Sequence, residues 1–313
     1  MDTRSLLYFC EATKDLNFTR TANRMFISQQ DLSNHIARLE KEFNCRLFER
    51  KPRLALTYSG QCLLEFAQKY QTDEDNIRAM LSDIKEKAEG SLGIGCSLFR
   101  TSIAMPSLAQ RYHEMFPNVH LQFFSRHSDE LMNLLLSGRL DFTISIDRFN
   151  HPLIETDILF RDSLYMMVSR KLLFEYYGEN YADLLPGEGE CAELAAFSAL
   201  PFLNILSVRL IDDIFRCSGI TPNYLISVSH PPFARTSLFE GIAASIVTKT
   251  IYLHLRGTLS EDMLFIPLVM PPSMDLHPVC FIRNTKKHYS KLTRAFHDLA
   301  VNYFSELSDN TKC

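Results

Sequence analysis

One predicted helix carries polar side chains of the types that read DNA. Residues 29–43 repeat Leu32, Ile36, Leu39 and Phe43 at three- and four-residue steps, which predicts an amphipathic helix with Leu32, Ile36 and Leu39 in the core. Amides can bind an adenine edge in the major groove, serine can bond a base or a phosphate, and arginine can contact the phosphate backbone. The opposite face is a candidate nucleic-acid interface, although a solvated helix surface has a similar composition; it holds Gln29, Gln30, Ser33, Asn34 and Arg38.

A serine marks the start of this helix. Ser28 is followed three residues later by Asp31, an acidic variant of a capping box. The serine oxygen can accept a hydrogen bond from a backbone N–H of the first turn, and the carboxylate favours the positive end of the helix. Two shorter helices are expected before it, over about residues 2–14 and 19–25, so the polar face belongs to the third helix of a compact N-terminal group.

A basic hairpin is expected after the third helix. Residues 46–57 read as two strand-like ends around a proline-containing tip, whose cations Arg50, Lys51 and Arg53 suit a wing lying along a phosphate backbone. Residues 1–60 hold ten Lys and Arg against seven Asp and Glu, a net charge of +3, whereas the other 253 hold 23 against 30, a net charge of −7. The overall charge of −4 therefore conceals a modestly basic N-terminal part.

These residues carry a family resemblance. Residues 18–40, FTRTANRMFISQQDLSNHIARLE, followed by LFER at 47–50 and Leu56-Thr57-x-x-Gly60, closely resemble the winged helix-turn-helix of LysR-type bacterial transcriptional regulators. The family commonly has proline and a small residue after Ser28-Gln29 and often arginine at position 34, where this chain has Gln30, Asp31 and Asn34. The operator preference of relatives therefore does not transfer, and Asp31 either weakens DNA binding or serves only the helix cap.

A long linker helix is expected over residues 59–89. Its apolar positions recur at a spacing of about 3.5, which is compatible with a coiled coil, and packing on its own domain is the alternative. The resemblance implies pairing with a second copy, giving a homodimer or homotetramer whose two heads read two related half-sites. The apolar positions are Leu63, Phe66, Ala67, Tyr70, Ile77, Met80, Leu81, Ile84 and Ala88.

The remainder of the chain reads as two α/β lobes. A strand–helix–strand–helix–strand order within 90–161 predicts a parallel sheet with helices on both faces. The whole fold class is α+β multidomain: a winged helix-turn-helix over 1–58, a linker and dimerisation helix over 59–89, and a two-lobed α/β domain over 90–313. By resemblance this last domain is a periplasmic-binding-protein-like, type 2, effector domain. Lobe I covers about 90–161 and 267–306, and lobe II about 162–266.

Strand ends should line an effector cleft between these lobes. Hydroxyls and free N–H groups at such positions suit an anionic small molecule such as a carboxylate, although helix capping alone is the alternative for each residue. They match the effector-contact regions of the family by position only. The candidate effector-binding residues are Ser97, Thr101, Ser102, Ser128, Asn204 and Thr248.

Other constellations argue against an enzyme or a metalloprotein. His113, His120 and His127 recur every seven residues but fall on a helix, a strand and a loop, so no metal site is expected. No nucleophile, base and orienting group occur together, and no cofactor fingerprint is complete. The eight cysteines are expected to be reduced and mostly buried, with a redox role for Cys191 or Cys217 left open. The acidic stretch 176–193 is expected to be a loop.

The sequence therefore predicts a DNA-binding transcriptional regulator controlled by a small molecule. Its partners would be promoter DNA, the effector, further copies of the chain and, for an activator, RNA polymerase. Every apolar run is far shorter than the ~18 residues of a membrane span, so we expect a cytoplasmic protein without a membrane partner. Two alternatives are a two-lobed solute-binding protein or enzyme with a helical oligomerisation head, and a regulator that acts only through protein partners.

Overall fold

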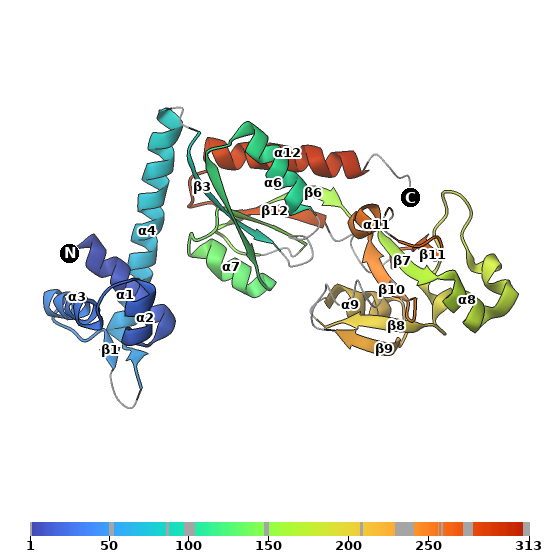
Figure 1. The fold of residues 1–313 in the computed structure, drawn as a ribbon, viewed down its shortest axis with the longest axis horizontal. Coiled ribbons are helices and arrows are strands. Elements are labelled where there is room, and N and C mark those ends of the chain that lie inside the picture. The colour runs from blue at the N-terminus through green and yellow to red at the C-terminus, as the bar shows by residue number, and fades with distance from the viewer. Residues whose placement is uncertain are drawn as a thin grey trace. The chain divides into compact units, whose positions relative to one another are not determined.

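The protein is described by a computed structural model (Figure 1). It divides into two compact units, Met1–Lys87 with Leu136–Arg139, and Ala88–Leu135 with Leu140–Cys313. The structure describes residues 2–49, 53–85, 88–96, 104–146, 150–206, 209–228, 241–255, 257, 259–271 and 278–308.

The N-terminal unit is a three-helix head with a short hairpin and a long helix. Its core holds Ile36 and Leu39 of the third helix with Leu6 and Phe9 of the first, and Leu32 is also fully buried, as the apolar spacing predicts. Its elements are α1 (Thr3–Asp15), α2 (Phe18–Arg24), α3 (Gln29–Glu42), β1 (Phe48–Glu49), β2 (Ala55–Leu56) and α4 (Tyr58–Ile84).

Phe43 follows the helical repeat of α3 but is not buried. Helix α3 ends at Glu42, and Phe43 is its C-cap residue, with 44% of its surface exposed. The next residue, Asn44, has a φ of 48°, so the chain turns there towards β1. The helical repeat thus places Phe43 on the core side, but the chain leaves the helix before other residues cover it.

A five-stranded mixed sheet forms the first part of the second unit. Strand order is β4-β3-β5-β12-β6; β3 pairs in parallel with β4 and β5, as predicted, whereas β12 runs antiparallel to β5 and β6. Strand β6 was not predicted. The elements are β3 (Gly90–Cys96), α6 (Met105–Met115), β4 (Val119–Ser125), α7 (Ser128–Leu136), β5 (Phe142–Ser145), β6 (Ile154–Arg161), β12 (Pro278–Asn284) and α12 (Lys291–Ser308).

Helices cover both faces of this sheet, as expected (Figure 1). Leu108 and Tyr112 of α6 and Phe296 of α12 pack on one face in a shared core. Leu131 and Leu135 of α7 pack on the other face, against Cys280 and Ile282 of β12. Met115 follows the helical spacing of Leu108 and Tyr112, but it ends α6 and is 49% exposed.

Two further small sheets share a second core. Strand β7 lies between β10 and β11 in antiparallel pairing, and β8 pairs in parallel with β9. Residues 178–184 form a 3₁₀ helix, which corrects the expectation of a loop throughout 176–193. The elements are β7 (Leu164–Ser169), α8 (Arg170–Tyr177), 3₁₀ helices Gly178–Leu184 and Leu194–Phe197, β8 (Pro201–Ile205), α9 (Arg209–Cys217), β9 (Asn223–Val228), β10 (Ser245–Thr248), α11 (Lys249–Leu255) and β11 (Met263–Pro267).

Candidate nucleic-acid interface and effector site

The start of α3 has the predicted cap. The Ser28 hydroxyl accepts a hydrogen bond from the Asp31 backbone N–H at 3.0 Å and donates to Asp31 Oδ2 at 2.6 Å. The carboxylate is thus held by the capping serine at the positive end of the helix. Asp31 therefore serves the cap, while its charge stays on the candidate interface.

The polar face of α3 is open to solvent. Gln29, Gln30, Asn34 and Arg38 are exposed, and Ser33 is half-buried. The Arg38 side chain is 60% exposed, and its Nη1 atom lies 3.6 Å from Oδ2 of Asp2, which precedes α1. Four of the five candidate side chains on this helix are therefore exposed to a partner.

An ion cluster holds α2 against α1, and the sequence pattern did not indicate it. Arg24 of α2 binds Glu11 and Asp15 of α1; its Nη2 lies 2.7 Å from Asp15 Oδ2. Burial alone would raise the pKa of Glu11, but hydrogen bonds from Lys14 and Arg24 outweigh it and lower that pKa. Hydrogen bonding from Arg24 likewise lowers the pKa of Asp15. The cluster fixes the helix that precedes the turn into α3.

The expected wing is present as a two-stranded hairpin. Phe48 pairs with Leu56 and Glu49 with Ala55 in antiparallel register. Arg53 lies between the strands and is exposed, whereas Arg50 and Lys51 lie outside the described residues. The hairpin is tied to α3 because Glu40 Oε1 accepts a hydrogen bond from the Leu47 N–H at 2.8 Å.

Helix α4 divides the predicted apolar stripe into two parts. Leu63 and Ala67 are buried in the core of the head, so packing on its own domain holds for these positions. The other apolar positions on α4 are exposed, and Ile77 is 54% exposed. Such a stripe on a surface helix marks an interaction surface. The exposed members are Phe66, Tyr70, Ile77, Met80, Leu81 and Ile84.

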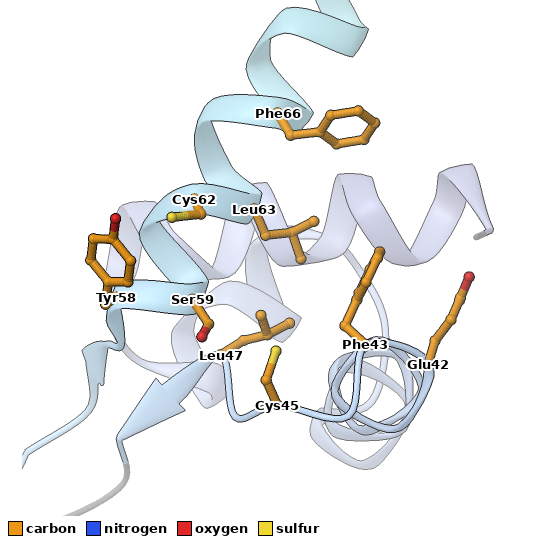
Figure 2. A pocket seen from close by; sticks show the side chains of 9 residues that line it. All are labelled: Glu42, Phe43, Cys45, Leu47, Tyr58, Ser59, Cys62, Leu63 and Phe66. Atoms are coloured by element: carbon orange, nitrogen blue, oxygen red, sulfur yellow. The ribbon is translucent and has the colours of Figure 1, made fainter.

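An apolar groove of about 710 Å³ lies at the base of α4 (Figure 2). Figure 2 shows Phe43 at the end of α3 and Phe66 on α4 as part of its lining. Phe43 and Phe66 are both exposed, so the groove extends the apolar surface of α4 to the end of the third helix. The other lining residues are Glu42, Cys45, Leu47, Tyr58, Ser59, Cys62 and Leu63.

Three candidate effector residues fall within the described part of the chain. Ser128 is the first residue of α7, Thr248 is the last residue of β10, and both are half-buried. Asn204 lies in β8, and its buried Oδ1 atom has no hydrogen-bond partner within the described structure. Ser97, Thr101 and Ser102 lie outside the described residues.

Other strand hydroxyls share the property of Asn204, and sequence reasoning missed them. In the described ranges, Ser125 Oγ at the end of β4, Thr143 Oγ1 in β5 and Ser245 Oγ in β10 are buried without a hydrogen-bond partner. A buried polar atom without a partner is costly, so such atoms mark positions for a water or a ligand. The signal in the sequence is a polar residue inside an otherwise apolar strand.

Two family models together match most of the chain. The model described as "Bacterial regulatory helix-turn-helix protein, lysR family" matches residues 3–61, and "LysR substrate binding domain" matches residues 85–305. The chain belongs to the LysR family of bacterial transcriptional regulators. It is a regulator with a helix-turn-helix domain and a substrate-binding-type domain, and its relatives are regulators rather than enzymes.

Known LysR-family proteins resemble the chain over different lengths. The regulator CitR of Bacillus subtilis is 30% identical over 168 residues, which cover 53% of this chain and 58% of CitR. The regulator cbl of Escherichia coli is 23% identical over 249 residues, covering 76% of this chain and 74% of cbl. The alignment thus spans little more than half the length of CitR but three quarters of cbl.

Solved structures share the fold. The LysR-family regulator CbnR has a TM-score of 0.62 at 20% identity, covering 97% of this chain and 99% of CbnR. A full-length OxyR variant of Pseudomonas aeruginosa has a TM-score of 0.70 at 18% identity, covering 97% of this chain and 94% of OxyR. CbnR in complex with its target DNA has a TM-score of 0.61 at 20% identity, covering 98% of this chain and all of that one.

Two neighbouring carboxylates on α9 of this LysR-family chain make structural contacts. Asp212 accepts a hydrogen bond from the Tyr224 hydroxyl at 2.7 Å, and Asp213 pairs with Arg216, so the two neighbouring carboxylates serve different contacts. In the described part of the chain, no group of three or more His, Cys, Asp or Glu residues could hold a metal ion. His113, His120 and His127 lie on α6, on β4 and in a loop, as predicted.

The burial expected for most cysteines is wrong for the described positions. Cys96 and Cys280 are buried, Cys62 is exposed, and Cys10, Cys45, Cys191 and Cys217 are half-buried. Burial raises the pKa of the Cys10 thiol to about 11, so this thiol stays protonated at neutral pH.

Among the described residues, no helix is long and apolar enough to cross a bilayer.

Proposed function

We propose that this regulator binds promoter DNA with α3 in the major groove and the wing on the phosphate backbone. The observation that carries the proposal is the division of α3 into a fully buried apolar face and an exposed face of amides and one guanidinium. Gln29, Gln30, Ser33 and Asn34 would contact base edges, and Arg38 would contact a phosphate. The wing cations Arg50, Lys51 and Arg53 would bind the flanking backbone.

The proposed assembly is a homodimer, or a homotetramer built from two kinds of contact. The exposed apolar stripe of α4 and the groove at its base supply the surface for a second copy. CbnR, a regulator of similar fold, has a solved structure with its target DNA, which supports the same partner for this chain. Because bacterial DNA lies in the cytoplasm, we propose that the protein acts there, with RNA polymerase as a further partner if it activates transcription.

The second unit would bind a small effector, and an anionic one suits the hydroxyls at its strand and helix ends. Ser128 and Thr248 have hydroxyls at a helix start and a strand end, and Asn204 has a buried amide oxygen without a partner in the described structure. Ser97, Thr101 and Ser102 belong to the same proposed site. A ligand that donates a hydrogen bond to Asn204 would remove the energetic cost of its unpaired oxygen, and this would favour the bound form.

A salt titration of binding to a fragment of its own promoter tests the DNA proposal. We expect log K to fall linearly with log salt concentration, because each phosphate contact releases counterions. Arg53→Ala should reduce the slope by roughly 0.9 and weaken binding to all sequences alike. Asn34→Ala should instead change the base preference. Lys171→Ala, at an exposed cation of α8 in the other unit, is the matched control.

Two results would overturn the DNA proposal. One is affinity that does not respond to salt, and the other is equal affinity for the promoter and for unrelated duplexes. Absence of any DNA binding by folded protein would favour the alternative of a regulator that acts only through protein partners.

A thermal-unfolding series tests the effector proposal. Small mono-, di- and tricarboxylates that carry a hydroxyl group serve as probes, because the hydroxyl can donate to Asn204 Oδ1 while the carboxylates accept. A binding probe should raise the unfolding midpoint with its concentration. Asn204→Ala should abolish that rise, whereas Asn223→Ala, at an exposed amide of β9, should retain it. A rise of equal size in the Asn204→Ala variant would remove Asn204 from the proposed site.

A further inference from the structure

Helix α3, the proposed recognition helix, is connected by hydrogen bonds to an acidic residue that precedes α1. Asp2 is the N-cap of α1, where its Oδ1 accepts from the Arg4 N–H at 3.1 Å and its Oδ2 accepts from the Ser5 hydroxyl at 2.9 Å. Ser5 is fully buried. Its Oγ also lies 2.8 Å from Nδ1 of His35 on α3. A chain of three side chains therefore connects the start of α1 to the middle of α3.

The protons of this chain can be assigned. Hydrogen bonds, chiefly from Ser5, lower the pKa of Asp2, so Asp2 is an ionised acceptor at neutral pH. Ser5 has a single hydroxyl proton, which it donates to Asp2, and its oxygen must accept from Nδ1–H of His35. The His35 ring also packs edge-on against Tyr8, with ring centroids 4.8 Å apart. The Asp2 carboxylate is therefore held in place from two helices.

The same carboxylate oxygen lies beside the proposed phosphate contact of α3. Arg38 Nη1 is 3.6 Å from Asp2 Oδ2, a separation that gives electrostatic attraction without a normal hydrogen bond. Arg38 is 60% exposed, so its guanidinium is accessible to a phosphate oxygen. Exposed ion pairs of this kind are weak. A phosphate and the Asp2 carboxylate thus compete for one cation.

We propose that Asp2 limits the affinity of the recognition helix for DNA by partly neutralising Arg38, and that Ser5 and His35 position its carboxylate for this role. The inference rests on the proposed function, in which Arg38 contacts a phosphate. The effect is independent of base sequence, because the competing groups are a carboxylate and a phosphate. Asp2 acts through Arg38 and is separate from the side chains that contact bases.

The test is a salt titration of DNA binding by full-length Asp2→Asn protein. Asparagine is as good an N-cap as aspartate, so α1 keeps its start. At ~0.1 M salt we expect roughly two- to five-fold tighter binding to the promoter fragment and to an unrelated duplex, the range that corresponds to a weak exposed ion pair. The log–log slope should become steeper by up to about 1. Asp2→Ser, a neutral cap of different shape, should give the same gain.

Two further variants isolate the role of Arg38. In an Arg38→Gln background the gain from Asp2→Asn should disappear, because the competing cation is gone. Glu65→Gln removes an equal charge from an exposed position of α4, and it should give less than half the gain of Asp2→Asn.

The possible results distinguish the inference about Asp2 from the proposed function. If Arg38→Gln weakens binding but neither Asp2 variant strengthens it, the inference about Asp2 is wrong and the proposed function stands. If the gain persists in the Arg38→Gln background, Asp2 repels DNA directly and the coupling to Arg38 is wrong. If Arg38→Gln leaves binding unchanged, Arg38 is not a phosphate contact, and both the inference and that part of the proposed function fail.

Discussion

Replacing Gly60 with alanine should loosen the head, although alanine normally favours a helix. Gly60 lies in the first turn of α4, where a Cβ atom would be 2.2 Å from the carbonyl oxygen of Leu47 and 2.7 Å from Cδ2 of Leu56. The same Leu47 oxygen accepts a hydrogen bond from the Thr57 N–H at 3.0 Å, and Thr57 Oγ1 donates to the Arg46 carbonyl at 2.6 Å. The obstructing atom belongs to the backbone and cannot rotate away.

The expected size of the effect follows from three contributions. Alanine in place of glycine stabilises a helix interior by about 1 kcal/mol. Overpacking costs about 1–3 kcal/mol, with the upper end expected here because backbone must move. Weakening the two hydrogen bonds of Thr57 without breaking them costs up to about 1 kcal/mol in total. We therefore expect Gly60→Ala to lower the free energy of unfolding of the head by roughly 2–3 kcal/mol.

Hydrogen exchange in the full-length protein measures this change locally. The chain has no Trp, so intrinsic tryptophan fluorescence is not a probe. A loss of 2–3 kcal/mol corresponds to a roughly 30- to 150-fold drop in protection across α1, α3 and the start of α4. Gln61→Ala, at the exposed neighbouring position, should keep wild-type protection, as should β12 in both variants. Equal or greater protection of the head in Gly60→Ala would refute the steric argument.

Two other predictions concern assembly and acid stability. Ile77→Asp places a charge in the exposed stripe of α4 and should shift sedimentation towards the monomer. Arg78→Ala, at the neighbouring position, should not. An unchanged sedimentation coefficient for Ile77→Asp would exclude this stripe from the interface. Because Glu11 and Asp15 have lowered pKa values in the folded head, their stabilisation is present above about pH 4.5 and is lost as pH falls through the lowered values. Protection of α2 should fall in that acid range, and Arg24→Gln should flatten this dependence; a parallel fall in both proteins would contradict it.

Helical periodicity predicted the centre of each helix better than its end. Leu32, Ile36 and Leu39 are fully buried, as their spacing indicates. Phe43 and Met115 follow the same spacing but lie at the ends of α3 and α6, where the neighbouring chain does not cover them. A repeat in the sequence specifies a face of the helix, whereas burial also depends on what packs over that face.

The sheet shows a second limit of sequence reasoning. The parallel pairing of β3 with β4 and β5 follows from the local strand–helix–strand order. The antiparallel insertion of β12 between β5 and β6 joins segments more than a hundred residues apart. Edge strand β6 was not predicted because it carries Glu155 and Asp157, and Phe160 is its one buried residue. Pairing between strands so far apart in the chain produces little pattern in the sequence around either strand.

The candidate interface was predictable in its composition but not in its electrostatics. Exposure of Gln29, Asn34 and Arg38 follows from the burial of the opposite face. The pairing of Arg38 with Asp2 depends on the packing of α1 against α3, and these residues are 36 positions apart. The number of charges in the head can therefore be read from the sequence, but which of them neutralise one another depends on the fold.

These charge pairings bear on how the regulator achieves specificity. The candidate face of α3 has one guanidinium, Arg38, while Asp31 in the cap and Asp2 beside the arginine add two carboxylates. A head with so small a positive surplus gains little affinity from phosphate contacts. Two heads linked through α4 would add their contacts at a fixed spacing, so only DNA with two correctly spaced half-sites would be bound well. We therefore expect a dimer-breaking change such as Ile77→Asp to reduce promoter binding far more than binding to unrelated DNA.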